Sequence, residues 1–282
     1  MLSELQKLDF EALKAFIGFC DKHGLRYYAI GGTLLGAVRH EGFIPWDDDV
    51  DVAMPRKDYD KFISLVTSGE KIGEDFSVEC WQAGDKIQSY FAKICATEFE
   101  IQEEVLEESS LRKGYLVDII PLDGTPECSF LRKLYYGRVM WLRFLCGTAN
   151  VHTGIVTSRP KWEQCVLRVV RALRLYRFLS VEKIYRKMER LFRRQKSETA
   201  SFAGTMMGAY KTKEIVPRKY FGETYDQCSS WKFEDLEIRG PKEWDAYLTH
   251  MYGDYRTLPP ESERKVHYKR QIRPILKETD RK

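Results

Sequence analysis

Acidic side chains gather in one short stretch of the sequence, PWDDDVDVAMP at residues 45–55. Within it, Asp49 and Asp51 are separated by one residue, and in a β-strand such residues point to the same face. Two carboxylates placed side by side repel one another unless a cation lies between them. Hard oxygen ligands of this kind suit Mg²⁺ or Mn²⁺. The pattern therefore predicts a metal site at Asp49 and Asp51, although such a run is also typical of a solvated turn or helix cap.

A glycine pair precedes this acidic stretch, in IGGTLLGAVRH at residues 30–40. Gly31 and Gly32 would let the backbone approach a phosphate, Thr33 would donate a hydroxyl, and the helix that follows would offer free N–H groups. Glycine pairs before helices are common, so this signal alone is weak. A glycine turn that feeds a helix and is followed by a strand with Asp-x-Asp is nevertheless typical of metal-dependent phosphoryl or nucleotidyl transfer.

A third carboxylate for such a site is Asp118, in YLVDIIPLDG at residues 115–124. It is a lone charge inside an apolar strand, where an unpaired carboxylate is expensive to bury. We expect Asp118 to bind a metal ion and to take the proton from the attacking hydroxyl. The alternative is that it pairs with a buried Arg or Lys. Asp47 and Asp48 lie in the approach to the strand, which favours a capping or supporting role.

The elements that must position these residues follow from hydrophobic periodicity. Ser3 and Gln6 form a capping-box pattern, so a first helix begins there and ends near Gly24. A strand is expected at 25–30, before the glycine pair and its short helix, and another at 49–53. A helix over 56–66 and strands at 76–80, 90–97, 99–105 and 115–120 complete this part of the chain. The fold class is therefore α+β, with a mixed or antiparallel sheet and flanking helices.

From about residue 130 the composition changes. Between residues 131 and 196 there are 17 Lys and Arg against 3 Glu and no Asp. The spacing within 165–179 predicts one helix with a stripe of arginines, at 168, 171, 174 and 177. We expect a core at 1–130, a basic helical insertion at 131–200 and a part at 201–282 that packs back on the core.

The basic segment has three interpretations. It would lie on an anionic membrane leaflet as a peripheral contact, form a solvated helical face, or, as a more distant alternative, bind RNA. The total charge of +4, from 46 basic and 42 acidic residues, is too even to indicate specific nucleic-acid binding by the whole protein.

Composition also bounds the class of protein. With 43% apolar residues among 282, the chain is long enough to bury a sizeable core. Its seven cysteines form no CxxC pair, and an odd number argues against a complete disulfide framework, so reduced thiols in a cytoplasmic protein are expected. The first residues lack the pattern of a signal peptide, and no apolar run reaches the roughly 18 residues of a membrane span.

The run GGTLLGAVRHEGFIPWDDDVDVAMPRKDYDKF resembles the signature of the LicD family, which is related to the fukutins and belongs to the nucleotidyltransferase superfamily. VDIIPLDGTP and MYGDYRTLPP are also similar to that family. The resemblance implies a nucleotidyltransferase-like fold and transfer of phosphocholine, or a related phospho-alcohol, from CDP-choline or another CDP-alcohol. The acceptor would be a sugar hydroxyl of a cell-surface glycan precursor, as in lipopolysaccharide or teichoic acid synthesis, and CMP would leave.

The same resemblance implies roles for particular residues. The family's Asp-x-Asp corresponds to Asp49 and Asp51, its third metal-binding carboxylate to Asp118, and its glycine turn to residues 31–33. Arg39 would contact a diphosphate or pair with the acidic cluster. Lys93 would contact phosphate or lie on a solvated strand edge.

Two further assignments concern the end of the chain and choline. His267 would orient the acceptor or nucleotide, unless it is a structural histidine. Trp46, Tyr252 and Tyr255 would form a cage for a quaternary ammonium, unless they are core residues.

The function expected from the sequence is therefore a Mg²⁺- or Mn²⁺-dependent phosphotransferase in the cytoplasm. A nucleotidyltransferase that uses an NTP is the alternative within the same chemistry. A non-catalytic RNA-binding or scaffold protein is the alternative from another class.

Overall fold

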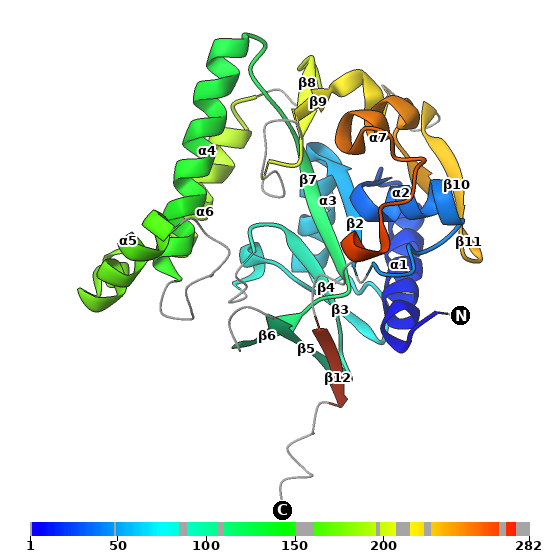
Figure 1. Ribbon diagram of the computed structural model, residues 1–282, viewed down its shortest axis with the longest axis horizontal. Helices are drawn as coiled ribbons and strands as arrows, with labels where there is room; N and C mark the ends of the chain where they lie inside the picture. Colours follow the sequence, from blue (N-terminus) through cyan, green and yellow to red (C-terminus); the bar gives the residue numbers. More distant parts are fainter. Residues whose placement is uncertain are drawn as a thin grey trace, which may run out of the picture.

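A computed structural model describes residues 2–47, 49–84, 89–105, 110–150, 161–195, 198–206, 215–222, 227–264 and 269–274. Its centre is a mixed sheet with strand order β1-β2-β7-β4-β3, extended at β7 by β8 and then β9 (Figure 1). The strands are β1 Tyr28–Ala29, β2 Val50–Pro55, β3 Phe76–Glu79, β4 Ala92–Ala96, β7 Val117–Gly124, β8 Phe202–Gly204 and β9 Ile215–Pro217. β2 and β7 run parallel, whereas the other pairs in this sheet are antiparallel. The mixed sheet with helices packed on it confirms the α+β class.

Helix α1 (Glu4–His23) begins and ends where its sequence signals predict. The Ser3 hydroxyl accepts from the Gln6 backbone N–H, and the Gln6 side chain accepts from the Ser3 N–H, each at 3.1 Å. Gly24 ends the helix with φ +60°, a left-handed conformation that glycine adopts without strain. Its buried side includes Leu13, Phe16 and Phe19, which join the main core.

Helices α2 (Gly31–His40) and α3 (Arg56–Thr67) flank strand β2 in the sequence and pack against the sheet. β2 is almost entirely apolar apart from Asp51, and Val50, Val52, Ala53 and Met54 are all buried. This is the pattern of a central strand covered on both faces. The predicted strand at 25–30 is shorter than expected, since only β1 is paired.

The C-terminal part of the chain lies against the central sheet. Hairpin β10 (Ser229–Phe233) and β11 (Leu236–Gly240) contacts α2 and β1, and α7 (Trp244–Tyr252) contacts η4 (Arg218–Phe221). A separate small sheet joins β12 (Lys269–Pro274) to β5 (Phe99–Val105) and β6 (Ser110–Gly114) (Figure 1). Two further short 3₁₀ turns are η1 (Trp81–Ala83) and η6 (Glu261–Glu263).

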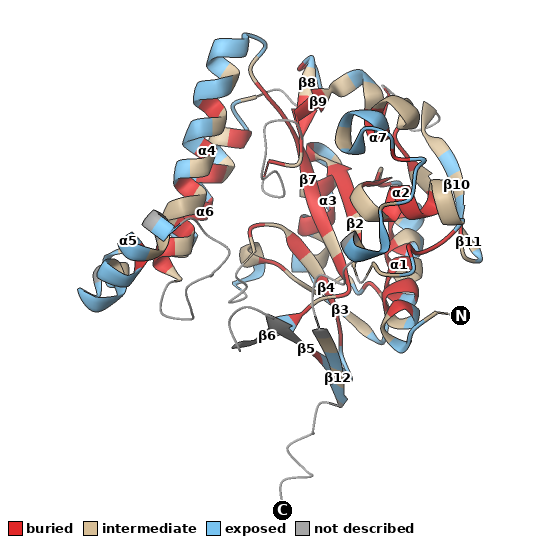
Figure 2. Ribbon diagram, viewed as in Figure 1, coloured by how far each residue is buried: buried red, intermediate tan, exposed pale blue. Residues whose placement is uncertain are grey.

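In its described part, the basic segment has the helices α4 (Ser129–Ala149), α5 (Lys161–Ala172) and α6 (Val181–Phe192), at one side of the molecule (Figure 1). α4 and α6 pack together around a second hydrophobic cluster that includes Val139, Met188 and Phe192. The outer sides of α4 and α5 are exposed (Figure 2). Within the described residues, no helix combines the length and apolar character that a membrane span requires.

The single helix predicted over 165–179 is wrong. α5 ends at Ala172, Arg174 has φ +54°, and a 3₁₀ turn, η2 (Leu175–Phe178), leads to α6. The four arginines therefore do not form one stripe. No glycine or proline marks this break in the sequence, so we attribute the turn to tertiary packing, which returns α6 along α4 and overrides local helix propensity.

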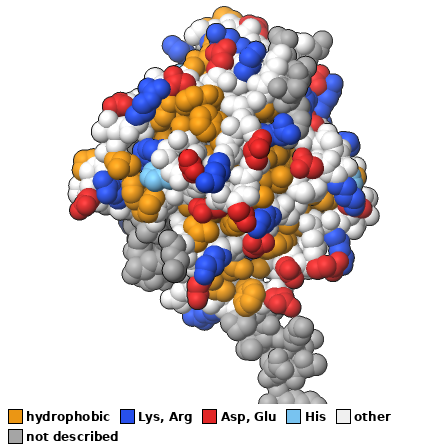
Figure 3. Space-filling view, turned by 90° about the vertical axis from the view of Figure 1, so that its right-hand side faces the viewer, with side chains coloured by type: hydrophobic (Ala, Val, Ile, Leu, Met, Phe, Trp, Pro, Cys, Tyr) orange, Lys and Arg blue, Asp and Glu red, His pale blue; other side chains and the backbone are white. Residues whose placement is uncertain are grey.

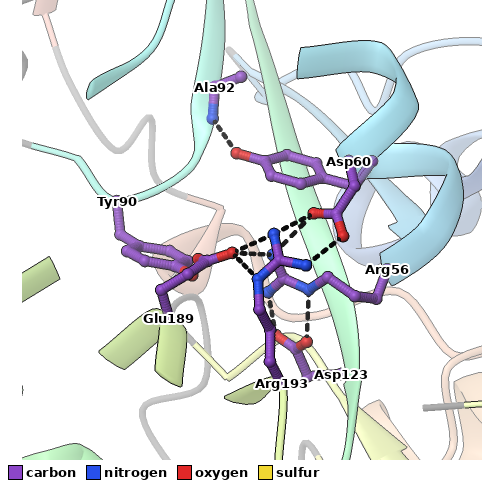
Figure 4. A network of polar contacts seen from close by, with 8 residues as sticks. Arg56, Asp60, Tyr90, Ala92, Asp123, Glu189 and Arg193 are labelled. Atoms are coloured by element: carbon purple, nitrogen blue, oxygen red, sulfur yellow. Dashed lines mark hydrogen bonds and ion pairs between the residues drawn. The ribbon is translucent and has the colours of Figure 1, made fainter. Parts of the chain in front are cut away.

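A buried network of charges ties α6 of the basic segment to the central sheet (Figure 4). Arg56 of α3 donates from Nε and Nη2 to the two carboxylate oxygens of Asp123, at 2.7 and 2.6 Å. Its Nη1 also lies 3.6 Å from Glu189 of α6 and 3.7 Å from Asp60. Burial lowers the pKa of Arg56, but the charges of Asp123, Tyr90 and Glu189 and the hydrogen bonds to Asp123 outweigh burial and hold this pKa above its ordinary value. The network thus fixes α6 to α3 and to the end of β7.

Candidate active site

Three predicted site residues lie in one row across three adjacent strands. Asp51 of β2 is the register partner of Asp118 of β7, and Asp118 is in turn the partner of Lys93 of β4. Neighbouring strands are about 4.8 Å apart, and partners in register point to the same face of a sheet. The sheet therefore brings together residues that are far apart in the sequence.

The beginning of α2 lies against Asp51. The Asp51 backbone N–H donates to the Thr33 hydroxyl at 2.9 Å, and the Ile30 N–H donates to the Asp51 carbonyl at 3.2 Å. Gly31 has φ +57°, and a Cβ added there would lie 3.3 Å from the Asp51 carboxylate. The predicted glycine turn is thus the first turn of α2 itself, and its close approach to the carboxylate requires glycine.

Several acidic side chains surround Asp51. Burial raises the pKa of this carboxyl well above its ordinary value, and the charges of Asp49, Asp118 and Asp47 raise it further, while Lys93 opposes them. Asp49 lies one residue before β2, so it enters the site from the loop. Asp47 also belongs to the cluster, because a Cβ added at Gly32 would meet its carboxylate. The sequence predicted only a capping or supporting role for Asp47, because its position depends on how the loop before β2 folds over α2.

The donor set fits a hard divalent cation in its chemistry. A half-buried carboxyl with a raised pKa and carboxylate neighbours is a place where a cation would offset repulsion. Asp118 at present faces Lys93, whose ammonium lies 2.5 and 2.7 Å from its two oxygens. Over the described ranges, no three acidic, His or Cys side chains are grouped closely enough to hold a metal ion together. Metal binding by Asp49, Asp51 and Asp118 would therefore require these carboxylates to move closer together.

Lys93 does not lie on a solvated strand edge. β4 is between β7 and β3, and the Lys93 side chain is 16% exposed. Its ammonium lies over the rings of Phe91 and Tyr115, at 4.8 and 5.0 Å from their centroids. The structure thus contains the alternative to metal binding, in which Asp118 pairs with a lysine. Contact between Lys93 and a phosphate stays a prediction.

Arg39 lies at the end of α2 and donates from Nη1 to the Tyr255 carbonyl at 3.1 Å. Burial lowers its pKa, and the nearby charge of Arg264 lowers it further. Its Nε is buried without a hydrogen-bond partner. In the part of the chain that is described, the contacts of Arg39 include no carboxylate, so it does not pair with the acidic cluster there. Contact with a diphosphate stays a prediction.

Tyr252, at the end of α7, lies close to Asp51, a position that the sequence did not predict. Burial raises the pKa of the Tyr252 hydroxyl, and the charges of Tyr247, Asp51, Asp47 and Asp49 raise it further, in that order. A Cβ added at Gly31 would lie 3.9 Å from that hydroxyl. Tyr252 therefore stands beside the acidic cluster, where it would donate a hydrogen bond.

The expected aromatic cage is not assembled as predicted. Tyr255 is buried in the main core, and its hydroxyl donates to Asp245 at 2.6 Å. The Trp46 ring is covered by the Arg264 guanidinium, 5.1 Å from its centroid. Arg264 is thus a cation beside both Trp46 and Arg39. His267 and Asp48 lie outside the described residues.

Residues 24–103 match one family model, described as LicD/FKTN/FKRP, nucleotidyltransferase domain. This range contains β2 and β4, with Asp49, Asp51 and Lys93, whereas Asp118 follows it.

Several curated relatives are similar to the chain. Lipopolysaccharide cholinephosphotransferase LicD of Haemophilus influenzae is 26% identical over 272 residues, which cover 95% of this chain and 96% of the relative. An uncharacterized protein of Rickettsia prowazekii is 40% identical over 150 residues, about half of each chain at 51% and 50%. Human ribitol 5-phosphate transferase FKRP is 44% identical over 48 residues, 17% of this chain and 10% of the relative.

Proposed function

We propose that the protein is a phospho-alcohol transferase acting on a glycan, because residues 24–103 match the LicD/FKTN/FKRP family model and the whole chain is similar to a cholinephosphotransferase. In the finer proposal, phosphocholine or a related phospho-alcohol is transferred from a CDP-alcohol to a sugar hydroxyl of a cell-surface glycan precursor. CMP is the second product. Similarity to relatives named for cholinephosphate and ribitol 5-phosphate transfer supports this class of reaction.

One observation supports the chemistry most directly. Asp51 and Asp118 are register partners on parallel strands, and the first turn of α2 lies against Asp51. Free N–H groups at the start of a helix attract phosphate oxygens. A phosphate held at this turn would lie beside the carboxylates, as phosphoryl transfer requires.

The reaction is an in-line displacement at the distal phosphorus of the diphosphate. The acceptor oxygen forms a bond to that phosphorus, and the bond from phosphorus to the bridging oxygen breaks, so that the bridging oxygen leaves with CMP. The proton of the acceptor hydroxyl passes to the Asp118 carboxylate. Lys93, which now contacts both Asp118 oxygens, would orient that carboxylate or contact a phosphate oxygen.

Asp49, Asp51 and Asp118 would hold Mg²⁺ or Mn²⁺, which would supply positive charge to the diphosphate when bound. Arg39, with its unpartnered buried Nε and Arg264 nearby, would bind the nucleotide's phosphates. Tyr252 would donate a hydrogen bond at the cluster, and His267 would orient the acceptor or the nucleotide.

The test is product analysis with the full chain. CDP-choline, CDP-ethanolamine, CDP-ribitol and CDP-glycerol are incubated separately with Mg²⁺, and phosphorus NMR follows the products. We expect slow release of CMP from one of them, by transfer to water, and none from the Asp118→Asn variant. As a matched control, Asp75→Asn changes a carboxylate outside the site and should leave this release unchanged.

A nucleotidyltransferase is the second candidate, because the matched family domain carries that description. It would attack the α-phosphate of an NTP and release pyrophosphate. Pyrophosphate from NTPs, with no CMP from any CDP-alcohol, would refute the phospho-alcohol proposal in favour of this one. Tight RNA binding with steep salt dependence and no turnover would instead favour the scaffold alternative. We place the reaction in the cytoplasm, at the inner face of the membrane.

A further inference from the structure

A basic groove runs between α4 and α6, remote in sequence from the acidic cluster. It encloses about 400 Å³ and is lined by Trp141, Leu142 and Leu145 of α4, by Leu191 of α6, and by four cations, Arg138, Lys187, Arg190 and Arg194. The floor is therefore apolar and the rim is basic. Such a groove matches a ligand with acyl chains and phosphate groups.

The rim cations are not paired with any carboxylate whose side chain the structure describes. Glu182 pairs with Arg186 at 2.5 Å, and Glu189 pairs with Arg193 at 2.6 Å. These contacts engage two of the three glutamates of the segment. Among the residues whose side chains are described, no carboxylate lies within ion-pair distance of the four groove cations. Their charge is thus available to an external anion.

Large apolar side chains are exposed next to the groove. On α4, Phe130, Leu134 and Trp141 are 67%, 56% and 58% exposed, and Arg138 stands between the last two. The spacing of 130, 134, 138, 141 and 145 places these residues on one side of the helix. Trp141 also lines the groove and stacks on Phe144, with centroids 5.7 Å apart. The apolar stripe and the basic rim therefore meet at Trp141.

Exposed apolar side chains also occur on α5 and in the turn that follows it. Val166, Val169 and Leu173, at i, i+3 and i+7, are 40%, 51% and 64% exposed, and Phe178 in η2 is 86% exposed. Arg168 and Arg171 are exposed on the same helix. The opposite side of the molecule, with α1 and β10, instead shows Lys and Arg interspersed with Asp and Glu (Figure 3).

We propose that α4, α5 and the α4–α6 groove form a docking surface for an anionic membrane leaflet. Trp141, Phe130 and Leu134 enter the interface between headgroups and acyl chains, and the groove cations bind lipid phosphates. Charge complementarity selects this occupant, because a protein partner would not require four uncompensated cations around exposed aromatic residues. The proposal names the residues that would make a peripheral membrane contact. It does not depend on the proposed reaction, because binding to vesicles needs no turnover.

The test is co-sedimentation of the full chain with vesicles of phosphatidylglycerol and phosphatidylethanolamine, against vesicles of phosphatidylcholine. We expect binding to the anionic vesicles that weakens with salt, and much weaker binding to the neutral ones. Arg190→Gln with Arg194→Gln should lower the affinity roughly 30-fold, because each cation near an anionic leaflet contributes about fivefold. Trp141→Ala should lower it about tenfold.

The control variant is Lys7→Gln with Lys232→Gln, which removes the same charge from α1 and β10 on the opposite side. It should change the affinity by less than about threefold, since screening weakens distant charges. Equal losses in the two double variants, or no binding by the wild type, would overturn the proposal. So would a dimer in solution that Trp141→Ala dissociates, because this face would then join two copies. All the changed side chains are exposed or at the surface, and unchanged thermal unfolding would show that each variant folds.

Discussion

The pair of Arg56 and Asp123 allows a quantitative prediction about stability. Both side chains are almost fully buried, at 6% and 2% exposed, and two hydrogen bonds of 2.6 and 2.7 Å join them. Replacing Arg56 by Met leaves a buried carboxylate without its cation, which costs about 3–5 kcal/mol. An unfolding entropy of about 2 cal/mol/K per residue implies that the melting temperature falls by roughly 5–8 °C for a chain of this length.

The two partners of this pair should respond unequally. After Asp123→Asn, Arg56 keeps the carboxylates of Asp60 and Glu189 within 3.7 and 3.6 Å. We expect this change to cost about 2 kcal/mol, less than Arg56→Met. Lys57→Met, on the same helix, is the matched control. It breaks an ion pair with Glu198 whose side chains are 72% and 46% exposed, so it should cost less than about 1 kcal/mol.

The deficit of Arg56→Met should depend on pH. Burial raises the pKa of Asp123, and Arg56 opposes this effect in the wild type. Without Arg56, the folded-state pKa lies further above the unfolded value, so the folded state takes up a proton as the pH falls through it and regains stability. The deficit should therefore be larger near pH 8 than near pH 5 in urea unfolding followed by circular dichroism. A deficit that is equal at both pH values, or equal to that of Lys57→Met, would refute the reasoning.

Three other predictions concern the acidic site. Asp49→Ala and Asp51→Ala should each abolish Mg²⁺-dependent CMP release while the protein stays folded, and near-normal turnover at low Mg²⁺ in either variant would contradict the metal assignment. Asp51→Asn should raise the melting temperature without metal at neutral pH. Burial and its acidic neighbours raise the folded pKa of Asp51, so the charged form costs stability above the unfolded pKa of about 4. Added Mg²⁺ should stabilise the wild type more than this variant in differential scanning fluorimetry, and equal shifts would count against Asp51 as a ligand. Gly31→Ala should lower the free energy of unfolding by about 1–2 kcal/mol, because alanine is strained at φ +57°. Gly137→Ala, in α4 with nothing within 4 Å of the added Cβ, should instead stabilise by about 0.5–1 kcal/mol in the same urea titration.

Local chemistry made several elements predictable. The capping box of Ser3 with Gln6 and the left-handed Gly24 mark both ends of α1, because these signals act within a single turn of the chain. The alternation of Asp and Val at residues 49–53 similarly predicted a strand, and β2 begins one residue later than expected, at Val50. The break after Ala172 was not predictable, since the residues there are good helix formers and packing of α6 on α4 decides the turn.

The sequence by itself determined which residues have the chemistry for phosphoryl transfer, through the spacing of Asp49 and Asp51, the glycine pair and the lone charge of Asp118. Only the tertiary structure decided how they combine. Strand pairing joins positions far apart in the chain, so it alone places Asp51 opposite Asp118 and brings the Lys93 ammonium into contact with the Asp118 carboxylate. Packing likewise brings Asp47 and Tyr252 to the cluster, and places the groove cations of α4 and α6 side by side. Contacts between distant segments depend on the whole core, and no local pattern encodes them.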